Sequence, residues 1–387
     1  MQYDVLIIGG AITGSAVAYW LTRLSPGLRV LVVERDMQYR YASTALSVAS
    51  IRQQFTTAVN IKISQFGAEF LKSAPEYLDC DPIPFHENGY LFLSSTEDAA
   101  RHLSKAASLQ NKLGAETIFL SPNELVSRFP WMQFDDITSG SFGSSNEGWF
   151  DNMSLLHAFQ KTAKQQGCDF IQDDVQAIQT KNKMISRAVL SKKGVISVGA
   201  VVNAAGTNAA NILKMVGLDL PVEPRKRTVF FIDAPHARFP DAPLIIDPAG
   251  YYIRPEGNQW ICATVPSNDR AVALDDFTAD YNQFEDSIWP KLYRRSSLFD
   301  AVKVLRYWVG HYAFNVLDQN AIVGPHPKLK GLFLANGFSG HGLQQAPAVG
   351  RGLAEMLVFG EYRSIDLSCL NVNRILSKKP FREDAIV

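Results

Sequence analysis

The first 34 residues of the chain contain the pattern that most constrains its fold. A short apolar run, residues 5–8, leads into Gly9-Gly10-Ala11-Ile12-Thr13-Gly14, and Glu34 ends a second apolar run 20 residues after Gly14. In such a strand–turn–helix unit the first glycine permits the sharp turn, the last lets helix and strand pack closely, and the helix N-terminus attracts a pyrophosphate. A carboxylate at the position of Glu34 typically binds a ribose hydroxyl. We therefore predict a Rossmann-type unit that binds an ADP-containing cofactor.

One position of this turn departs from the usual pattern. Ala11 stands where a middle glycine normally allows the backbone to approach the pyrophosphate, and we expect its single methyl group to be tolerated. The alternative, an ordinary strand–helix turn of an α/β protein, is disfavoured by the second strand and its terminal acid. The predicted cofactor contacts in this unit are Gly9, Ala11, Ile12, Thr13, Gly14, Glu34 and Arg35.

Composition places further limits on the class of protein. The 387 residues are 47% hydrophobic and 20% charged, and 38 basic residues balance 38 acidic ones. Such a chain is globular and long enough for two domains, and its zero net charge gives no reason to expect a nucleic-acid partner. The four cysteines are widely scattered, so the sequence predicts neither a disulfide framework nor a metal site.

The sequence shows no pattern of a signal peptide or of a transmembrane segment. Met1 and Gln2 lead directly into the first strand, and the apolar runs have the length of strands. A membrane-spanning helix would need about 20 consecutive apolar residues. We expect a cytoplasmic protein, and peripheral contact with a membrane stays open.

Segments of cofactor-binding character alternate with segments of another kind. The strand that ends in Asn203-Ala204-Ala205-Gly206 and the strand of residues 331–336 are typical of a parallel sheet whose strand ends face a ligand. Mixed segments with further strands, such as residues 87–94 and 251–254, interrupt them. We predict an α/β fold in which a Rossmann-type cofactor domain (1–80, 151–222 and 309–387) is interleaved with an α+β substrate domain on a mostly antiparallel sheet (81–150 and 223–308).

Four motifs occur together: the amino-terminal unit with Glu34, the Ser43-Thr44 pair, the Asn203–Gly206 strand end, and the loop Gly337-Phe338-Ser339-Gly340-His341-Gly342. Over nearly its whole length the chain resembles the D-amino-acid oxidase-like flavoproteins, which include sarcosine oxidase, dimethylglycine dehydrogenase, glycine oxidase and D-arginine dehydrogenase. The resemblance implies FAD rather than NAD. It extends the predicted FAD contacts to Ser43, Thr44, Ala49, Val175, Ala204, Ala205, Gly206, Gly337, Ser339, Gly340, His341, Gly342, Leu343 and Gln344.

A second set of segments resembles one branch of this family. Ile51-Arg52-Gln53-Gln54-Phe55, Asp318-Gln319-Asn320 and Gly324-Pro325-His326-Pro327 are similar to a branch that contains a mitochondrial flavoprotein implicated in the assembly of respiratory complex I. This similarity motivates an alternative function as an assembly or binding factor.

The family oxidises amines by hydride transfer from a C–H bond next to nitrogen to flavin N5, so the site must hold the substrate and stabilise negative charge on the flavin. The N–H groups of residues 340–343 at a helix start would face that charge, and tight packing of the helix on its sheet is the alternative. Arg52 occupies the position of an active-site arginine of sarcosine oxidase, and its planar guanidinium suits a substrate carboxylate. A structural ion pair is the alternative for Arg52.

Three further positions depart from the family pattern around the substrate. Gln344 stands where a second family cation, a lysine, is expected, and Tyr312 stands where D-amino-acid enzymes have an arginine. His311 lies near the position of a flavin-linking cysteine, and it is interpreted as a catalytic base or as a hydrogen-bonded core histidine. Tyr252 lies with Arg254 on one face of a strand expected to cover the flavin, with sheet packing as the alternative.

The same comparison of positions bears on flavin attachment and on the electron acceptor. None of the four cysteines matches the linking position and residues 43–50 contain no histidine, so noncovalent FAD is expected. No lysine occurs near residues 261–263, where sarcosine oxidase has the lysine that activates oxygen, and this favours a dehydrogenase over a fast oxidase. Oxygen, a quinone and a carrier protein stay open as acceptors. The run Arg225-Lys226-Arg227 is interpreted as a solvated strand edge.

The leading hypothesis is an FAD-dependent enzyme that oxidises the C–N bond of a small amine or amino acid, of the N-methyl or D-amino acid type, with Arg52, His311, Tyr252 and Gln344 at the substrate. Two alternatives are retained. One is a flavoprotein that acts mainly as an assembly or binding factor, and the other is a 2-hydroxy acid oxidoreductase on the same fold.

Overall fold

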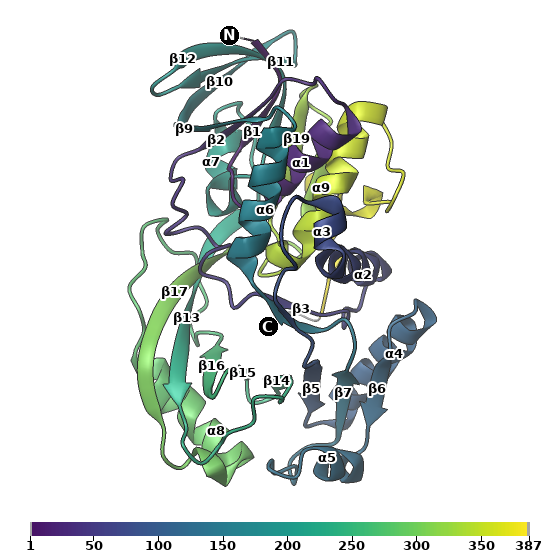
Figure 1. The fold of residues 1–387 in the computed structure, drawn as a ribbon, viewed down its shortest axis with the longest axis vertical. Helices are drawn as coiled ribbons and strands as arrows, with labels where there is room; N and C mark the ends of the chain where they lie inside the picture. Colours follow the sequence, from purple (N-terminus) through teal and green to yellow (C-terminus); the bar gives the residue numbers. More distant parts are fainter. Residues whose placement is uncertain (1, 385–387) are drawn as a thin grey trace.

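The computed structural model describes residues 2–384, which form two large β-sheets arranged one after the other along the long axis of the molecule (Figure 1). The predicted fold class is confirmed: one sheet is mainly parallel and covered by helices, and the other is mostly antiparallel. The proposed domain boundaries stay a prediction. Strand β17 (Lys303–Asn315) continues across the boundary that was predicted after residue 308.

The first sheet contains the amino-terminal unit. β1 (Gln2–Ile8) lies between β2 (Val30–Glu34) and β12 (Gly194–Asn203) and runs parallel to both. β19 (Leu332–Asn336) extends this parallel part beyond β12, and β9 (Asp169–Gln172) extends it beyond β2. Antiparallel pairs add β10 (Val175–Lys181), β11 (Met184–Leu190) and β18 (Ile322–Pro325). The carboxyl ends of the parallel strands therefore share one edge, where α/β proteins bind their ligands.

Helices cover both faces of the first sheet. On one face, the core formed by α1 (Ile12–Leu24), α2 (Ala58–Lys72), α6 (Asn152–Gln165) and α9 (Gly342–Phe359) includes Ile7 and Val32. On the other face, α7 (Ala209–Lys214) packs in a core that includes Leu6 and Leu31. Successive side chains of a strand point to opposite faces, so these strands are apolar at nearly every position.

The second sheet follows the order β17-β13-β16-β15-β14-β5-β7-β6, in which only the β14–β5 pair is parallel. Its strands are β5 (Tyr90–Ser94), β6 (Thr117–Leu120), β7 (Ser139–Gly143), β13 (Val222–Asp233), β14 (Leu244–Asp247), β15 (Tyr251–Glu256), β16 (Gln259–Thr264) and β17 (Lys303–Asn315). One face is buried in a core with Phe230 and Trp260, and the other carries Tyr90, Val229 and Tyr252.

Shorter elements complete the chain. They are β3 (Ser50–Ile51), β4 (Phe85–His86), β8 (Gly148–Phe150), α3 (Ala74–Tyr77), α4 (Glu97–Lys112), α5 (Pro122–Arg128), α8 (Trp289–Arg295), α10 (Asn373–Leu376), a π-helix (Gln283–Ile288) and 3-10 turns at Gly206–Asn208, Ser297–Phe299 and Ser368–Leu370. β3, β8 and β4 form a small third sheet.

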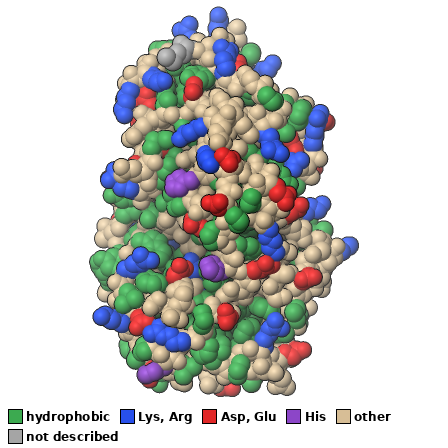
Figure 2. Space-filling model, viewed as in Figure 1, with side chains coloured by type: hydrophobic (Ala, Val, Ile, Leu, Met, Phe, Trp, Pro, Cys, Tyr) green, Lys and Arg blue, Asp and Glu red, His purple; other side chains and the backbone are tan. Residues whose placement is uncertain are grey.

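The surface agrees with the balanced composition. Figure 2 shows basic and acidic side chains interspersed over the face in view. Within residues 2–384, no helix combines the length and the apolar character needed to cross a bilayer.

Candidate functional site

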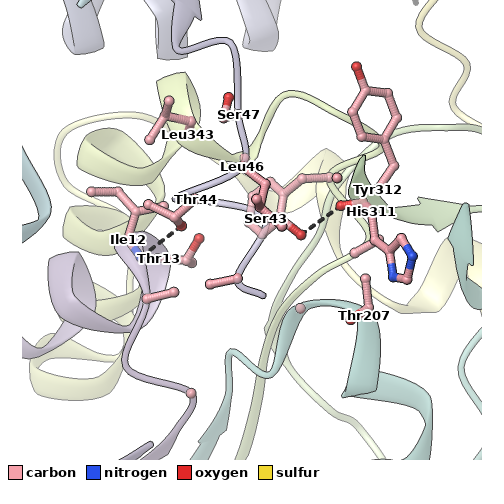
Figure 3. A pocket seen from close by; sticks show the side chains of 18 of the residues that line it. Ile12, Thr13, Ser43, Thr44, Leu46, Ser47, Thr207, His311, Tyr312 and Leu343 are labelled. Atoms are coloured by element: carbon pink, nitrogen blue, oxygen red, sulfur yellow. Dashed lines mark hydrogen bonds between the residues drawn. The ribbon is translucent and has the colours of Figure 1, made fainter. Parts of the chain in front are cut away.

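A cavity of about 770 Å³ lies between the carboxyl edge of the first sheet and the second sheet, and Figure 3 shows part of its wall. This volume is within the range of small-molecule and cofactor sites. All residues predicted for the site line this cavity except Gly14, Ala49 and Gly337. The lining residues are Gly9, Ala11, Ile12, Thr13, Glu34, Arg35, Ser43, Thr44, Arg52, Val175, Ala204, Ala205, Gly206, Tyr252, His311, Ser339, Gly340, His341, Gly342, Leu343 and Gln344.

The glycine turn after β1 is shaped by two close backbone approaches. Gly9 has φ +100°, and a Cβ atom there would lie 2.4 Å from the carbonyl oxygen of Ala204. A Cβ atom on Gly14 would lie 1.9 Å from the carbonyl oxygen of Gly9. Gly14 therefore acts behind the cavity wall, where it allows α1 to start directly beneath the turn.

Ala11 is compatible with this turn. It is the N-cap of α1, with φ −71° and ψ −167°, an extended conformation that any residue adopts. The next N–H group, that of Ile12, donates to Oγ1 of Thr44 at 3.3 Å (Figure 3). The start of α1 and the Ser43-Thr44 segment thus meet at the cavity.

The Glu34 carboxylate is held in place at the end of β2. Its Oε2 accepts from the N–H of Gly10 at 2.8 Å, and its Oε1 accepts from the N–H of Asp36 at 3.0 Å. Each carboxylate oxygen has a further lone pair, so Glu34 can still accept from a ribose hydroxyl. The ribose role stays a prediction.

The loop before α9 turns sharply around an aromatic ring. Gly340 has φ +100°, and a Cβ atom there would lie 2.7 Å from the ring of Tyr312. α9 then begins at Gly342 with His341 as its N-cap, and no acidic residue lies in its first turn. The N-terminus of an 18-residue helix therefore faces the cavity with its partial positive charge uncompensated by a local acid.

Arg52 and His341 meet at the wall of this cavity. Arg52 is only 2% exposed, and its Nη2 lies 3.0 Å from Nε2 of His341. Its Nη1 donates to the carbonyl of Gln54, and its guanidinium lies 4.0 Å from the centre of the Phe55 ring. A guanidinium only donates, so Nε2 of His341 accepts and the ring proton is assigned to Nδ1. Burial, followed by the charge of Arg52, holds the pKa of His341 well below its usual value.

Gln344 links this pair to the helices. Its Oε1 accepts from the N–H of Arg52 at 3.0 Å and from Oγ of Ser64 at 3.3 Å. Among the described residues, no acceptor is found for its Nε2, so this amide group can donate to a molecule in the cavity.

Three tyrosines, Tyr90, Tyr252 and Tyr312, line the same cavity. Burial raises the pKa of Tyr90 to about 12 and that of Tyr252 well above its ordinary value. Their phenols therefore stay neutral at physiological pH.

His311 is held by a loop that sequence reasoning left unassigned. Its Nε2 donates to the carbonyl of Asp276 at 2.8 Å, and its ring stacks on Phe277 at 4.2 Å between ring centres. Its own carbonyl accepts from Oγ of Ser43 at 2.6 Å (Figure 3). Burial lowers the pKa of the imidazole. This environment supports the interpretation as a hydrogen-bonded core histidine that also forms part of the cavity wall.

The interpretation of Arg225-Lys226-Arg227 as a solvated strand edge is wrong. Arg227 is 6% exposed and lines the cavity, and its Nη1 and Nη2 lie 2.7 and 3.0 Å from the carboxylate oxygens of Asp269. Lys226 pairs with Asp276 at 2.9 Å. These acids are on the loop of residues 265–280, more than 40 positions along the chain, so the charge run alone could not reveal them. Strand alternation, which separates Arg227 from Lys226, was the available signal.

The fold and this cavity can be compared with known proteins. A family model described as FAD dependent oxidoreductase matches residues 4–356. The chain belongs to this family of FAD-dependent oxidoreductases.

Individual members of this FAD-dependent oxidoreductase family resemble the chain over nearly its full length. FAD-dependent oxidoreductase domain-containing protein 1 of Bos taurus is 37% identical, covering 99% of this chain and 87% of that protein. Mitochondrial dimethylglycine dehydrogenase of Rattus norvegicus is 24% identical over 96% of this chain and 44% of that protein. The structure of L-proline dehydrogenase from P. horikoshii superposes with a TM-score of 0.88 at 25% identity, covering 98% of this chain and 99% of that one.

The residues of the cavity fit the FAD of this oxidoreductase family. The Gly9 turn and the start of α1 suit a pyrophosphate, and the carboxylate of Glu34 ends the neighbouring strand. The start of α9 offers N–H groups to an electron-rich carbonyl. Within the described part of the chain, none of the four cysteines lines the cavity.

Proposed function

We propose that the chain oxidises the C–N bond of a small amine or amino acid that carries a carboxylate. The observation that carries the proposal is the buried guanidinium of Arg52 at the end of the FAD cavity, beside a neutral His341. A guanidinium in a water-poor cavity attracts a carboxylate strongly and orients it through two parallel hydrogen bonds.

The neighbouring groups complete a site for the amine part of such a substrate. The neutral phenols of Tyr252 and Tyr312 and the amide of Gln344 can hydrogen-bond a polar substrate without adding charge. The buried positive charge of Arg52 disfavours an ammonium group beside it and so favours the neutral amine, the form that can be oxidised. FAD, when bound, supplies the two-electron acceptor for the C–H bond next to the nitrogen.

The test is anaerobic mixing of the FAD-loaded protein with N-methyl amino acids, D-amino acids, L-proline and 2-hydroxy acids. Bleaching of the oxidised flavin band by an amine would support the proposal, and bleaching by hydroxy acids alone would favour the alternative substrate class. If no compound bleaches the flavin and the protein binds a partner protein tightly, a role as an assembly or binding factor would be favoured.

Two variants sharpen this test. In Arg52→Ala we expect a raised KM or lost turnover while FAD stays bound, because the carboxylate loses its partner. Arg29→Ala is the matched control, since Arg29 pairs with Asp4 on the surface and is 53% exposed. Unchanged kinetics in Arg52→Ala would remove Arg52 from the substrate site.

We also propose noncovalent FAD and electron transfer to an acceptor other than oxygen. Ala263, opposite Tyr252 on the neighbouring strand, and the adjacent Cys262 and Ile261 provide no lysine that could activate oxygen. Acid precipitation should release all the flavin, and a yellow pellet would contradict this. Chemically reduced protein should be reoxidised faster by a quinone than by oxygen.

A further inference from the structure

The carboxy-terminal segment returns after α10 to the chain that follows Arg52. Arg374 on α10 forms a buried ion pair with Asp318, with Nε 2.6 Å from Oδ2. The same Oδ2 accepts from the N–H of Phe381 at 3.0 Å, and the carbonyl of Phe381 accepts from Nδ2 of Asn320 at 3.2 Å. The segment is therefore anchored two residues before Glu383.

Glu383 inserts its side chain beneath the loop that follows Arg52. It is 2% exposed, and its Oε1 accepts from both the N–H and Oγ1 of Thr56 at 2.7 Å. Its Oε2 accepts from the N–H of Thr57 at 3.1 Å, from Oγ1 of Thr57 at 2.7 Å and from Nδ2 of Asn60 at 3.0 Å. These five hydrogen bonds gather one short stretch of chain around one carboxylate.

This carboxylate supplies a helix cap from a distant part of the sequence. Thr57 is the N-cap of α2, its side chain makes no capping hydrogen bond, and the first turn of α2 contains no acidic residue. Glu383 accepts from the N–H of this N-cap residue and places a negative charge at the positive end of the helix.

α2 connects the residues around Glu383 to the first turn of α9. Ser64 on α2 donates to the same Gln344 oxygen that receives the N–H of Arg52. Asn60, a partner of Glu383, also accepts from Nε2 of Gln345 at 3.1 Å. The negative charge of Glu383 also opposes the lowering of the pKa of Arg52 by burial.

The opposite side of the Arg52 loop is held by a second buried carboxylate. Oε1 of Glu147 accepts from the N–H of Gln53 at 2.8 Å, and its Oε2 accepts from Nε2 of Gln54 at 2.8 Å. Residues 52–57 have no regular secondary structure of their own, so these two carboxylates set their path.

We propose that Glu383 is a positioning residue that holds Arg52 at the cavity wall for carboxylate recognition, which rests on the proposed function. Without this carboxylate, the donors of the half-buried Thr56 and Thr57 and of the buried Asn60 lose their acceptor. The loop then relaxes, and the guanidinium of Arg52 leaves the geometry that binds a carboxylate.

The test compares the FAD-loaded wild type with Glu383→Gln, which keeps the side-chain shape but removes the charge and one acceptor. Asp384→Asn is the matched control, because Asp384 is exposed and contacts Thr56 through its backbone N–H alone. Benzoate, followed by the change in flavin absorbance, serves as the carboxylate probe. We expect its Kd to rise about tenfold or more in Glu383→Gln and to stay unchanged in Asp384→Asn.

A second measurement does not depend on the proposed function. Hydrogen exchange should become faster in residues 50–60 of Glu383→Gln while FAD content stays that of the wild type. Unchanged exchange there, or an unchanged benzoate Kd, would overturn the positioning role. If the wild type itself binds no benzoate, the proposed function fails, and the exchange result still decides whether Glu383 positions the loop.

A helix cap with a purely structural role predicts another pattern. It would lower the melting temperature without a selective change in benzoate binding, which would overturn the proposal. If Glu383→Gln does not fold, Glu383→Asp keeps the charge but withdraws the carboxylate by one methylene. This variant should show the same changes to a smaller extent.

Discussion

Nη2 of Arg52 lies 3.0 Å from Nε2 of His341, although the two residues are 289 positions apart in the sequence. This contact joins the loop after β3 to the N-cap of α9. It fixes the tautomer of the histidine and orients the guanidinium, so two segments that contact the cavity from different sides form one unit.

Replacing His341 should show how much this contact contributes to the free energy of unfolding. In His341→Phe the guanidinium of Arg52 loses an acceptor in a buried place, and we expect the free energy of unfolding to fall by about 1–3 kcal/mol. His341→Gln offers an acceptor of similar reach and should recover part of the loss. Urea denaturation with saturating FAD measures both, and equal stability of His341→Phe and wild type would contradict the expectation.

The same histidine should make stability depend on pH. Its pKa in the folded protein lies well below the ordinary 6.5, so the unfolded chain binds a proton first as the pH falls. The stability of the wild type relative to His341→Phe should therefore be constant above pH 6.5 and decrease as the pH falls below it. A difference that does not vary with pH would contradict this assignment.

Glu147 should produce the opposite dependence. Burial raises the pKa of its carboxyl from 4.5 to about 7, so the native state keeps the proton longer than the unfolded chain does. The stability that Glu147 contributes below pH 4.5 should therefore be lost as the pH rises through about 7. Since each pKa unit corresponds to about 1.36 kcal/mol, the loss in the free energy of unfolding is roughly 3 kcal/mol.

Glu147→Gln removes the titratable carboxyl group. The stability of this variant relative to the wild type should therefore rise as the pH increases from 4.5 to about 7. Glu361→Gln is the control, because the side chain of Glu361 is 65% exposed. Denaturation series at several pH values measure both differences. A Glu147→Gln difference as flat as that of Glu361→Gln would show that Glu147 does not titrate in this interval.

The glycine turn makes a prediction about cofactor content. Gly14→Ala would place a methyl group 1.9 Å from the carbonyl oxygen of Gly9, so α1 must shift away from the turn. We expect the purified variant to contain little FAD, measured by the ratio of flavin to protein absorbance. Ala11→Gly is the matched control and should keep its FAD, because the extended backbone of residue 11 suits both residues.

The attachment of the loop of residues 265–280 to Arg227 should depend on the carboxylate of Asp269. Asp269→Asn leaves the buried guanidinium of Arg227 without its carboxylate, and we expect a loss of about 2 kcal/mol in the free energy of unfolding. Asp4→Asn, in the exposed pair with Arg29, should cost less than about 1 kcal/mol. Chemical denaturation of both variants compares the pairs, and equal losses would argue against a special role of the loop.

Local chemistry explains what could be predicted from the sequence. The Gly9–Gly14 turn, the strand that ends in Glu34 and the small residues of 203–206 each carry their information within a few positions, because a turn or strand end constrains its own residues. The same holds for the sharp loop at Gly340. These segments indicated the fold class and the edge of the sheet at which we predict the cofactor.

Tertiary structure alone decided how the charged groups are used. Arg227 is a buried cavity residue because Asp269 reaches it from a separate loop, and Arg52 is positioned by His341, Glu147 and Glu383 from three distant segments. A charged side chain can be buried only where partners compensate it, and those partners are brought together by the fold. The amino-acid sequence by itself thus determined the fold class and an FAD-dependent family, whereas long-range packing decided which charged groups surround Arg52.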